Sequence, residues 1–371
     1  MIDLWLTKPK SETTVLVAMS GGVDSSTVAV MLKQAGYNVI GVTLQLYNAA
    51  TVPEKSKACC GIKDIHDART VAAKFDIKHY VLDYESVFKQ EVMEQFADDY
   101  LAGSTPVPCI RCNQSVKFRD LMKIAKDIKA DAMVTGHYVQ RKMVNNIAEL
   151  HRAADLTKDQ SYFLFSTTQE QLDFLHFPLG KYTKVQVRQI ARDYGIHTSD
   201  KKDSQDICFV PDGDYVKVVQ RLRPGTLESG DIVDIKTGKK LGTHNGLINY
   251  TIGQRKGIGI ASEKPYYVIK MDFITHKLFV SGESDLYSTE FVIGELNLFP
   301  SYLTQNMEIE AEVCLRALQP LIPARIMLNS DGITANIRLY KGGRAITKGQ
   351  ACVIYDGSRI IGGGFIKSII Q

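Results

Sequence analysis

The sequence predicts an N-terminal α/β domain with a parallel, doubly wound sheet, followed by a second half built of antiparallel β-strands. In the first half, apolar runs of strand length alternate with segments of helical period, which is typical of a parallel sheet covered on both faces. From about residue 231 onward, short alternating runs are separated by Gly, Asp, Asn or Lys turns. That pattern is typical of a small barrel or sandwich.

The expected strands of the first half rest on apolar runs of strand length. Residues 14–19 (TVLVAM) form a run that suits a strand buried on both faces, and residues 132–135 (AMVT) form another. Two further runs lie between them, at 38–46 and 79–82. Segments of helical spacing separate the strands, and we therefore expect them to pair in parallel.

The expected helices rest on apolar residues spaced three and four apart. Residues 28–35 carry such a stripe, and apolar residues between 88 and 100 recur every four positions. Further helices are expected at 64–75, 116–128 and 183–194. Residues 199–223 are polar and are expected to be irregular.

The changes of pattern divide the 371 residues into three expected domains, which suits this length. The α/β domain is expected at 1–210, a small central domain at 211–285 and a β-barrel at 286–371. Hydrophobic content of 44% and charged content of 23% exclude a mainly disordered chain. No apolar stretch is long enough for a membrane span, and the first ten residues do not resemble a secretory signal. We expect a cytoplasmic protein whose formal charge of +4 permits an anionic partner.

Residues 20–26 (SGGVDSS) lie between the first strand and the first helix. The adjacent glycines Gly21 and Gly22 let the backbone turn sharply and bring its N–H groups close to an oxyanion. The hydroxyls of Ser20 and Ser25 add donors, and the following helix directs the positive end of its dipole to the same place. The loop is therefore predicted to hold a pyrophosphate group.

Other interpretations of this loop are weaker. It is neither GxxxxGK[ST] nor GxGxxG, so a P-loop or a dinucleotide site is not indicated. A plain strand–turn–helix connection capped by serine is the structural alternative. The fixed spacing of SGG and DS directly after the first strand favours phosphate binding over that alternative.

The chain has seven cysteines, an odd number that does not indicate a secreted disulfide framework. Cys314 and Cys352 alternate with apolar neighbours and are expected in the core. The others are Cys59, Cys60, Cys109, Cys112 and Cys208.

Cys109 and Cys112 form a CxxC pair, and Cys112 is expected where the next helix begins. A thiol at a helix N-terminus beside Arg111 should have a lowered pKa. Cys208 lies in a polar, partly basic segment far downstream. A lone CxxC leaves open half a zinc site, a redox pair or two unrelated thiols, and residues 59–60 lack the spacing for a second zinc-binding pair.

Six segments, taken in order along the chain, resemble the MnmA family of tRNA-specific 2-thiouridylases in the ATP pyrophosphatase (PP-loop) superfamily. They are 20–26 (SGGVDSS), 105–118 (TPVPCIRCNQSVKF), 135–138 (TGHY), 158–162 (KDQSY), 201–210 (KKDSQDICFV) and 250–257 (YTIGQRKG). The first segment alone would fit several ligases, whereas six in this order are specific. The resemblance implies an ATP pyrophosphatase domain, a small central domain and a C-terminal β-barrel that contacts tRNA.

The resemblance also implies a reaction. ATP with Mg²⁺ adenylates C2 of the wobble uridine of tRNA, and sulfur from a cysteine persulfide then gives 2-thiouridine, AMP and pyrophosphate. The residues implied in ATP binding are Ala18, Met19, Ser20, Gly21, Gly22, Val23, Asp24, Ser25, Leu44 and Gly136.

By the same resemblance, Cys208 carries the persulfide, which a sulfur-relay protein delivers, and Cys112 is the nucleophile. Either the two form a disulfide bond as sulfur moves, or Cys112 attacks the persulfide to release hydrosulfide. The chain is expected to work as a monomer. The residues implied in tRNA binding are His137, Lys158, Asp159, Gln160, Arg316, Ala317 and Gln350. Ala317 stands where the family barrel usually has an aromatic residue.

One departure from the family concerns Cys109, which stands where many members have an aspartate. A protonated thiol is a poor general acid or base compared with a carboxylate. Cys109 would instead be a third thiol, and Cys109, Cys112 and Cys208 could together ligate a [4Fe–4S] cluster.

Two other functions stay open from the sequence. One is a pyrophosphate-releasing ligase that acts on a small metabolite and needs no cysteine. The other is an RNA-binding protein with a vestigial nucleotide fold, which the intact SGGVDSS loop argues against.

Overall fold

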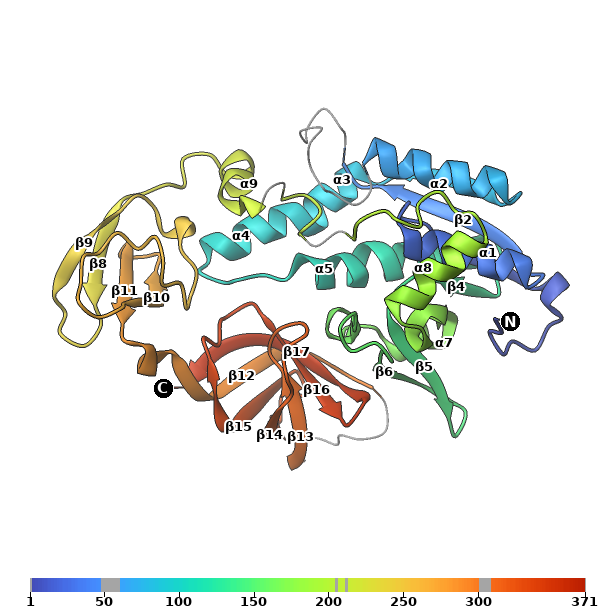
Figure 1. Ribbon diagram of the computed structural model, residues 1–371. Helices are drawn as coiled ribbons and strands as arrows, with labels where there is room; N and C mark the ends of the chain where they lie inside the picture. Colours follow the sequence, from blue (N-terminus) through green and yellow to red (C-terminus); the bar gives the residue numbers. More distant parts are fainter. Residues whose placement is uncertain (1, 48–60, 204–205, 211–212, 300–307, 371) are drawn as a thin grey trace. The chain divides into compact units, whose positions relative to one another are not determined.

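The computed structural model describes residues 2–47, 61–203, 206–210, 213–299 and 308–370 (Figure 1). The chain forms two compact units. The first contains Met1–Met93, Pro108–Gly213 and Ser358–Ile360, and the second contains Glu94–Val107, Asp214–Gly357 and Ile361–Gln371. Cys59 and Cys60 lie outside the described residues.

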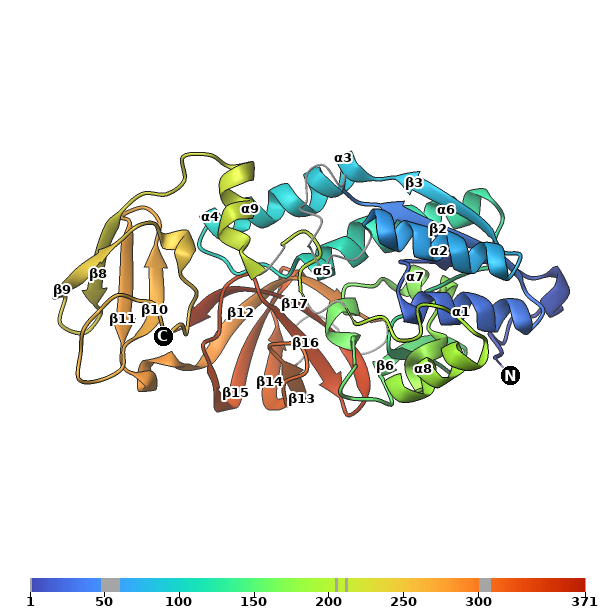
Figure 2. The ribbon, with the colours of Figure 1, turned by 45° about the horizontal axis from the view of Figure 1, so that its top comes forward.

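Five parallel strands form the sheet of the first unit (Figures 1 and 2). They are β1 (Thr14–Ala18), β2 (Asn38–Gln45), β3 (Lys78–Asp83), β4 (Ala132–Val134) and β7 (Leu175–His176). Their order across the sheet is β3-β2-β1-β4-β7, and every neighbouring pair is parallel. The parallel sheet is confirmed, and the four expected strands agree with the observed ones to within one residue. The two-residue strand β7 was not expected.

Helices cover both faces of this sheet. Val15 and Val17 of β1 face a core shared with α1, α2 and α8. Because successive strand residues point to opposite faces, Leu16 faces the other side, where α6 packs against β1 and β4. The bounds are α1 (Val23–Gln34), α2 (Ile62–Lys74), α6 (Leu121–Asp127), α7 (Gln169–Phe174) and α8 (Lys184–Asp193).

Two long helical stretches contain π-helical turns. One runs through α3 (Glu85–Phe88), η3 (Lys89–Glu94) and α4 (Gln95–Leu101), and the other through α5 (Pro108–Arg111), η4 (Cys112–Asp120) and α6. The second stretch begins eight residues before the expected start at 116. Within the described ranges, no helix combines the length and apolarity needed to cross a membrane.

A polar hairpin of β5 (Val139–Val144) and β6 (Ile147–Arg152) was not expected from the sequence. Its turn is made by Asn145 and Asn146, both with positive φ, at 49° and 64°. Asparagine tolerates this left-handed conformation better than most residues, which allows the two-residue turn. In the second strand of the hairpin, His151 pairs antiparallel with Arg359, the first residue of β17 (Arg359–Ile370), and both residues belong to the first unit.

The expectation of irregular chain over 199–223 is wrong in part, because α9 (Tyr215–Leu222) is a regular helix. Asp214 caps it by accepting a hydrogen bond from the Lys217 backbone N–H at 3.2 Å. The Tyr215 ring stacks on Tyr100, with 4.6 Å between ring centroids, so tertiary packing supports a short helix that polar composition obscured.

The second unit begins with a four-stranded sheet. Its strands are β8 (Gly230–Asp234), β9 (Lys240–His244), β10 (Tyr267–Asp272) and β11 (Lys277–Ser281), in the order β10-β11-β8-β9. The pairing of β11 with β8 is parallel, which differs from the antiparallel pattern expected throughout this half.

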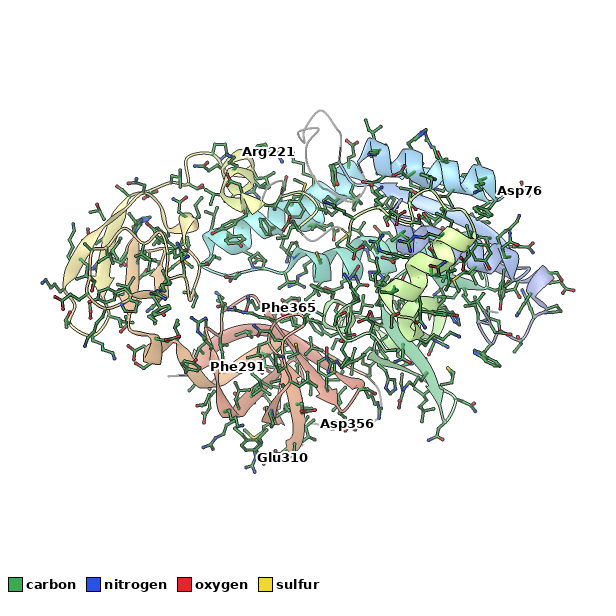
Figure 3. All side chains as sticks on the ribbon, viewed as in Figure 1. Asp76, Arg221, Phe291, Glu310, Asp356 and Phe365 are labelled. Atoms are coloured by element: carbon green, nitrogen blue, oxygen red, sulfur yellow. The ribbon has the colours of Figure 1, made fainter. Side chains whose placement is uncertain are left out.

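Six strands close into a barrel at the C-terminal end of the second unit. They are β12 (Tyr287–Leu298), β13 (Glu308–Cys314), β14 (Ile322–Leu328), β15 (Thr334–Arg344), β16 (Ala351–Asp356) and β17 (Arg359–Ile370). Pairing of β12 with both β15 and β17 closes the barrel, as expected. Phe291 is buried in its core and Glu310 is exposed (Figure 3). Cys314 and Cys352 are buried here, which confirms that expectation.

Short 3₁₀ turns complete the described structure. They are η1 (Lys10–Glu12), η5 (Ser161–Leu164), η6 (Pro178–Lys181), η8 (Leu247–Asn249) and η9 (Glu283–Leu286).

Candidate nucleotide and thiol site

The carboxyl ends of β1 and β4 lie side by side at the point where the strand order of the sheet reverses. β2 and β3 extend the sheet on one side of β1, whereas β4 and β7 extend it on the other. Ligands of open α/β sheets bind outside the strand ends at such a switch point. The loops 19–22, after β1, and 135–138, after β4, therefore frame the candidate site.

The first loop is shaped by glycine and tied to the helix that follows it. Gly21 has a φ of +76°, and a Cβ there would lie 1.9 Å from the Asp64 carbonyl oxygen, so glycine is required. The Ser25 hydroxyl accepts a hydrogen bond from the Ser20 backbone N–H at 3.0 Å and lies 3.2 Å from the Ser20 hydroxyl. The first backbone N–H groups of α1 have no intrahelical partner, so loop and helix together suit an anion.

The second loop approaches the first so closely that only glycine fits between them. A Cβ on Gly136 would lie 2.8 Å from the backbone nitrogen of Ser25 and 3.0 Å from the carbonyl carbon of Asp24. Both atoms belong to the first turn of α1 and cannot move without moving the loop. Gly136 therefore fixes the spacing of the two loops.

The other residues expected to bind nucleotide lie at the same edge of the sheet. Ala18 is the last residue of β1, and the Met19 backbone N–H continues the pairing by donating to the Val42 carbonyl at 2.8 Å. The Thr43 hydroxyl donates to the Met19 carbonyl at 2.6 Å. Leu44 is buried near the carboxyl end of β2.

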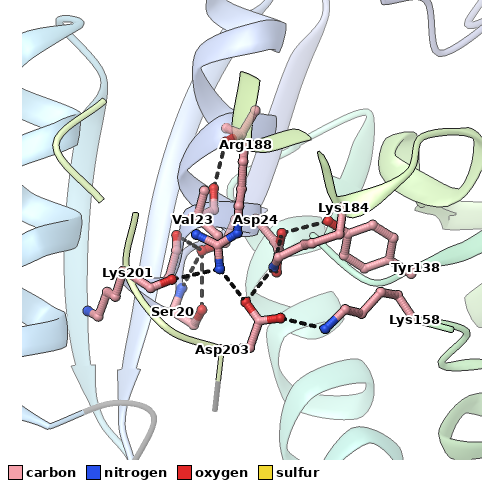
Figure 4. A network of polar contacts seen from close by, with 12 residues as sticks. Ser20, Val23, Asp24, Tyr138, Lys158, Lys184, Arg188, Lys201 and Asp203 are labelled. Carbon is pink, nitrogen blue, oxygen red and sulfur yellow. Dashed lines mark hydrogen bonds and ion pairs between the residues drawn. The ribbon is translucent and has the colours of Figure 1, made fainter. Parts of the chain in front are cut away.

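Asp24, at the start of α1, is held by a lysine and a tyrosine (Figure 4). The Lys184 ammonium lies 2.7 Å from its carboxylate, and the Tyr138 hydroxyl donates to it at 2.8 Å. Burial and the charge of Asp24 raise the pKa of Tyr138, so the phenol stays protonated and remains a donor. This pairing joins the phosphate loop to the 135–138 loop and to α8.

Asp203 binds three cations beside this pair (Figure 4). Lys184 and Arg188 of α8 each contact Asp203 Oδ1 at 2.8 Å, and the Lys158 ammonium contacts Oδ2 at 2.7 Å. Burial alone would raise the pKa of Asp203, but hydrogen bonds from Lys158 and Lys184 lower it to about 2. The carboxylate is therefore ionised at neutral pH.

Lys201 is paired within the protein. Its ammonium donates to the Gly21 carbonyl at 3.0 Å and contacts the carboxylates of Asp64 and Asp67, each at 2.5 Å. Burial opposes its charge, yet these two carboxylates raise the pKa of Lys201. Residues 201 and 203 thus attach the segment leading to Cys208 to the phosphate loop.

The helix that carries the CxxC pair begins at Pro108, so the expectation that it begins at Cys112 is wrong. Cys109 lies in its first turn and is exposed, whereas Cys112 is the fifth helical residue and is 6% exposed. Next to it, the Asn113 side-chain amide donates to the Phe163 carbonyl at 3.1 Å. Cys112 also begins the π-helical segment, a geometry often found at functional sites.

Cys208 is partly exposed and lies next to a fully buried aromatic residue, Phe209. The Phe209 ring meets the Phe88 ring edge to face, with 5.7 Å between centroids. Phe88 ends α3, and α3 packs against η4, the segment that Cys112 begins. The chain segments of both thiols are therefore anchored at α3, while a direct approach of the two sulfur atoms stays a prediction.

His137, expected to contact tRNA, is packed between aromatic rings. Its Nδ1 lies 2.7 Å from the Thr135 hydroxyl oxygen, and its ring meets Phe118 and Phe177 at centroid distances of 5.9 and 6.4 Å. Burial, with a smaller contribution from the charge of Lys117, lowers the pKa of His137 to about 3. The ring is therefore neutral at physiological pH.

The neighbouring candidates for tRNA binding make internal contacts that shape the site. Asp159 accepts hydrogen bonds from Arg152 Nε at 3.1 Å and from the Ser161 hydroxyl at 2.8 Å. Gln160 Oε1 accepts from the Tyr138 backbone N–H at 2.8 Å. Their contacts with tRNA stay predictions, but their positions support the 135–138 loop.

The barrel candidates lie in loops of the second unit. Arg316 donates to the Ala345 carbonyl at 3.1 Å, and Ala317 follows it in the partly exposed connection between β13 and β14. Leu318 in the same loop is 60% exposed, with a φ of +63°. The partly exposed Gln350 lies just before β16.

The sequence did not single out Lys184, Arg188 or Asp203 for the site. Lys184 and Arg188 are four residues apart and share one face of α8, a spacing that is visible in the sequence. Their partner Asp203 lies in one of the six segments of the resemblance, but nothing in that segment identifies which cations it binds.

Family models match almost the whole chain. Residues 13–212 match the model described as the tRNA methyl transferase HUP domain, and residues 218–282 match the tRNA methyl transferase PRC-barrel domain. Residues 288–366 match the aminomethyltransferase beta-barrel domain.

Two relatives named as tRNA-specific 2-thiouridylases align with nearly the full chain. The chain is 50% identical over 360 residues to the tRNA-specific 2-thiouridylase MnmA of Rickettsia felis, covering 97% of this chain and 98% of the relative. It is 51% identical over 355 residues to that of Rickettsia bellii strain OSU 85-389, covering 96% of each. A 4-thiouridine synthetase in complex with RNA and ATP is 18% identical, with a TM-score of 0.37, covering 57% of this chain and 50% of that one.

The parallel sheet with a glycine- and serine-rich phosphate loop at its switch point defines a PP-loop nucleotide-binding domain. Full-length identity near 50% to the relatives then makes the assignment specific. The chain belongs to the MnmA family of tRNA-specific 2-thiouridylases.

Proposed function

We propose that this chain is an ATP-dependent sulfurtransferase that converts the C2 carbonyl of the wobble uridine of tRNA to a thiocarbonyl. The main support for this activity is that relatives named as tRNA-specific 2-thiouridylases align over nearly the full chain. The attachment of the Cys208 segment to the phosphate loop, through Lys201, adds support. The products are 2-thiouridine, AMP and pyrophosphate.

ATP binds at the loop 19–25 in this proposal. A uridine carbonyl oxygen is a poor leaving group, and attack of this oxygen on the α-phosphate, with loss of pyrophosphate, makes it part of AMP. The N–H groups at the start of α1 and the hydroxyls of Ser20 and Ser25 suit the phosphates, and Leu44 and Gly136 border the nucleotide.

Mg²⁺ neutralises pyrophosphate charge when it is bound. In the described part of the chain, no three His, Cys, Asp or Glu side chains gather as a metal site. The donor set therefore fits an ion held chiefly by phosphate oxygens, as is common for Mg²⁺, with Asp24 as the carboxylate on the loop.

Sulfur arrives as a persulfide on Cys208, delivered by a sulfur-relay protein. Sulfur replaces the adenylated oxygen at C2, and AMP leaves. Cys112 either attacks the persulfide to release hydrosulfide or closes a disulfide with Cys208 as sulfur moves to the base. Each route ends in a disulfide that an external reductant must reopen.

Further parts of the proposal follow from the family. The protein works as a cytoplasmic monomer with domains at 1–210, 211–285 and 286–371. The tRNA is contacted by His137, Lys158, Asp159, Gln160, Arg316, Ala317 and Gln350.

A [4Fe–4S] cluster on Cys109, Cys112 and Cys208 gains no support from the described residues, which contain no group of three metal-binding side chains. An iron and sulfide assay on anaerobically purified protein separates the two chemistries, and a stoichiometric cluster would favour the iron–sulfur chemistry.

The test uses cysteine variants with ATP, Mg²⁺, tRNA and a persulfide donor. Cys112→Ser and Cys208→Ser should each lose thiolation, whereas Cys352→Ala, which alters only the barrel core, should retain it. Full turnover by Cys112→Ser would favour a small-metabolite ligase. Failure of the wild type to release pyrophosphate would favour an RNA-binding protein without activity.

A further inference from the structure

The segment before Cys208 is held on the phosphate loop chiefly by charge. Helix α8 binds it through Arg188, which donates to the Ser199 carbonyl at 2.5 Å and to the Lys201 carbonyl at 2.8 Å. Asp203 completes the attachment through its contacts with Arg188 and Lys184. Residues 199–203, which we name the latch segment, are thus held by Lys184 and Arg188, in addition to the exposed pair of Arg192 with Asp200 and the contacts of Lys201 and Lys158 given above.

The same cations lie where a nucleotide phosphate would add negative charge. Lys184 bridges Asp203 and Asp24, and Asp24 is the second residue of α1, directly after the phosphate loop. Three cations, Lys158, Lys184 and Arg188, meet two carboxylates here, which leaves one net positive charge (3 − 2 = +1). A phosphate bound at the loop and the Asp203 carboxylate therefore repel each other while both are attracted to these cations.

We propose that Asp203 is a positioning residue that exchanges with a nucleotide phosphate on Lys184 and Arg188. Without ATP, Asp203 keeps the latch segment on the phosphate loop. When ATP binds, its phosphates take up the cations, Asp203 is released, and the segment that carries Cys208 can move. This inference rests on the proposed function, because it requires ATP at the loop.

The displacement of Asp203 by a nucleotide phosphate sets the order of two steps, ATP binding and sulfur transfer. Cys208 follows Asp203 by five residues, so release of the latch segment frees the chain that leads to this thiol. Phe209 retains its contact with Phe88 and limits that movement to the chain before it. Sulfur is then presented only after ATP has bound, which protects the persulfide from release before the uridine is adenylated.

The test compares Asp203→Asn with Asp200→Asn in the full chain. Asp200 lies in the same segment and loses the same charge, but its partner is Arg192, at 2.7 Å, and both side chains of that pair are exposed. ATP affinity is measured with Mg²⁺ by titration calorimetry. Backbone mobility is measured by hydrogen exchange of peptides that cover residues 199–210, with exchange in β1 and β4 as the check on folding.

Asp203→Asn should bind ATP at least about threefold more tightly than the wild type, because one repulsive charge is gone. Its latch segment should exchange rapidly with or without ATP, whereas the wild-type segment should exchange faster only when ATP is added. Asp200→Asn should match the wild type in both measurements, and Asp203→Glu, which retains the charge, should return the affinity toward the wild-type value.

Unchanged or weaker ATP binding by Asp203→Asn would overturn the proposal that a phosphate displaces Asp203. A wild-type latch segment whose amide hydrogen exchange does not respond to ATP would overturn it as well. Failure of the wild type itself to bind ATP would overturn the proposed function and, with it, the exchange. The two failures are distinguishable because the first leaves wild-type ATP binding intact.

Discussion

Gly136 shows how one absent side chain sets the geometry of the site. Its Cα faces the backbone of Asp24 and Ser25, where an added Cβ would lie 3.0 Å or less from two backbone atoms. We expect Gly136→Ala to push the loop 135–138 away from α1 and to weaken ATP binding roughly tenfold, since overpacking costs about 1–3 kcal/mol. Titration calorimetry with ATP and Mg²⁺ measures the change.

Gly282→Ala is the matched control for this prediction. No atom lies within 4 Å of a Cβ at Gly282, and its φ of −70° suits alanine. It should leave ATP affinity unchanged. Equal affinities of Gly136→Ala and the wild type would show that the spacing of the two loops is not critical.

His176 makes stability depend on pH. It is 6% exposed, its Nε2 has no hydrogen-bond partner, and burial, with a smaller contribution from Arg141, lowers its pKa to about 3. The unfolded chain takes up a proton near pH 6.5 and the folded chain does not, so this group destabilises the fold as pH falls from about 6.5 toward 3.

We therefore expect His176→Phe to gain stability over the wild type in acid. The gain at pH 5 should exceed the gain at pH 7.5 by about 2 kcal/mol, because phenylalanine binds no proton. Urea unfolding at the two pH values measures it. An equal effect at both pH values would contradict the assigned protonation.

At the scale of elements, α8 positions the cations of the site. Its first residue is Lys184, and a capping box precedes it: Thr183 Oγ1 accepts from the Gln186 backbone N–H at 3.3 Å, and Gln186 Oε1 accepts from the Thr183 N–H at 2.8 Å. Loss of such a cap costs about 1 kcal/mol. The fraying would also loosen Lys184.

Thr183→Ala should therefore weaken ATP binding by roughly three- to tenfold and lower stability by about 1 kcal/mol. Thr168→Ala is the control, because Thr168 and Gln171 form the same capping box on α7, which carries no residue of the site. It should lose similar stability and retain ATP affinity. Equal losses of affinity in both variants would mean that α8 acts only through general stability.

Sequence patterns predicted the elements that are buried and periodic, and missed those that are not. Val15 and Val17 lie in an apolar run that predicted β1, whereas the strands of the β5–β6 hairpin mix polar and apolar residues and contain no such run. The π turns after Cys112 were also missed, since apolar spacing does not distinguish them from α-helix.

The site was predictable in part. The SGGVDSS loop and its place at a strand end follow from local chemistry. The partners of Asp203 do not: Lys184 lies 19 residues before it (203 − 184), and only packing of α8 on the sheet brings them together. Charge alone does not identify Lys184, rather than another cation of the chain, as a partner of Asp203.

At the scale of the whole molecule, two short segments each belong to a different unit from the residues that flank them in the sequence. They are Glu94–Val107, in the second unit, and Ser358–Ile360, in the first. In the latter, Arg359 pairs with Glu149 at 3.1 Å, and both side chains are mostly buried. This ion pair therefore joins residues 358–360 to β6 within the first unit.

Arg359→Ala should lower the melting temperature by roughly 2–4 °C, because it leaves a buried carboxylate with one cation fewer. Arg325→Ala removes an exposed pair with Glu310 on the barrel and should change it by less than about 1 °C. Differential scanning calorimetry compares them. Similar shifts for both variants would show that the Arg359 pair does not link the segments.

The central claim is that the phosphate loop and the thiols of Cys112 and Cys208 act in one reaction on tRNA. It is tested most directly by mass analysis of nucleosides from unmodified tRNA incubated with the protein, ATP, Mg²⁺ and a persulfide donor. We predict that 2-thiouridine appears at the wobble position only when ATP is present, with AMP and pyrophosphate released. Unchanged uridine under these conditions, despite bound ATP and a loaded persulfide, would contradict the account.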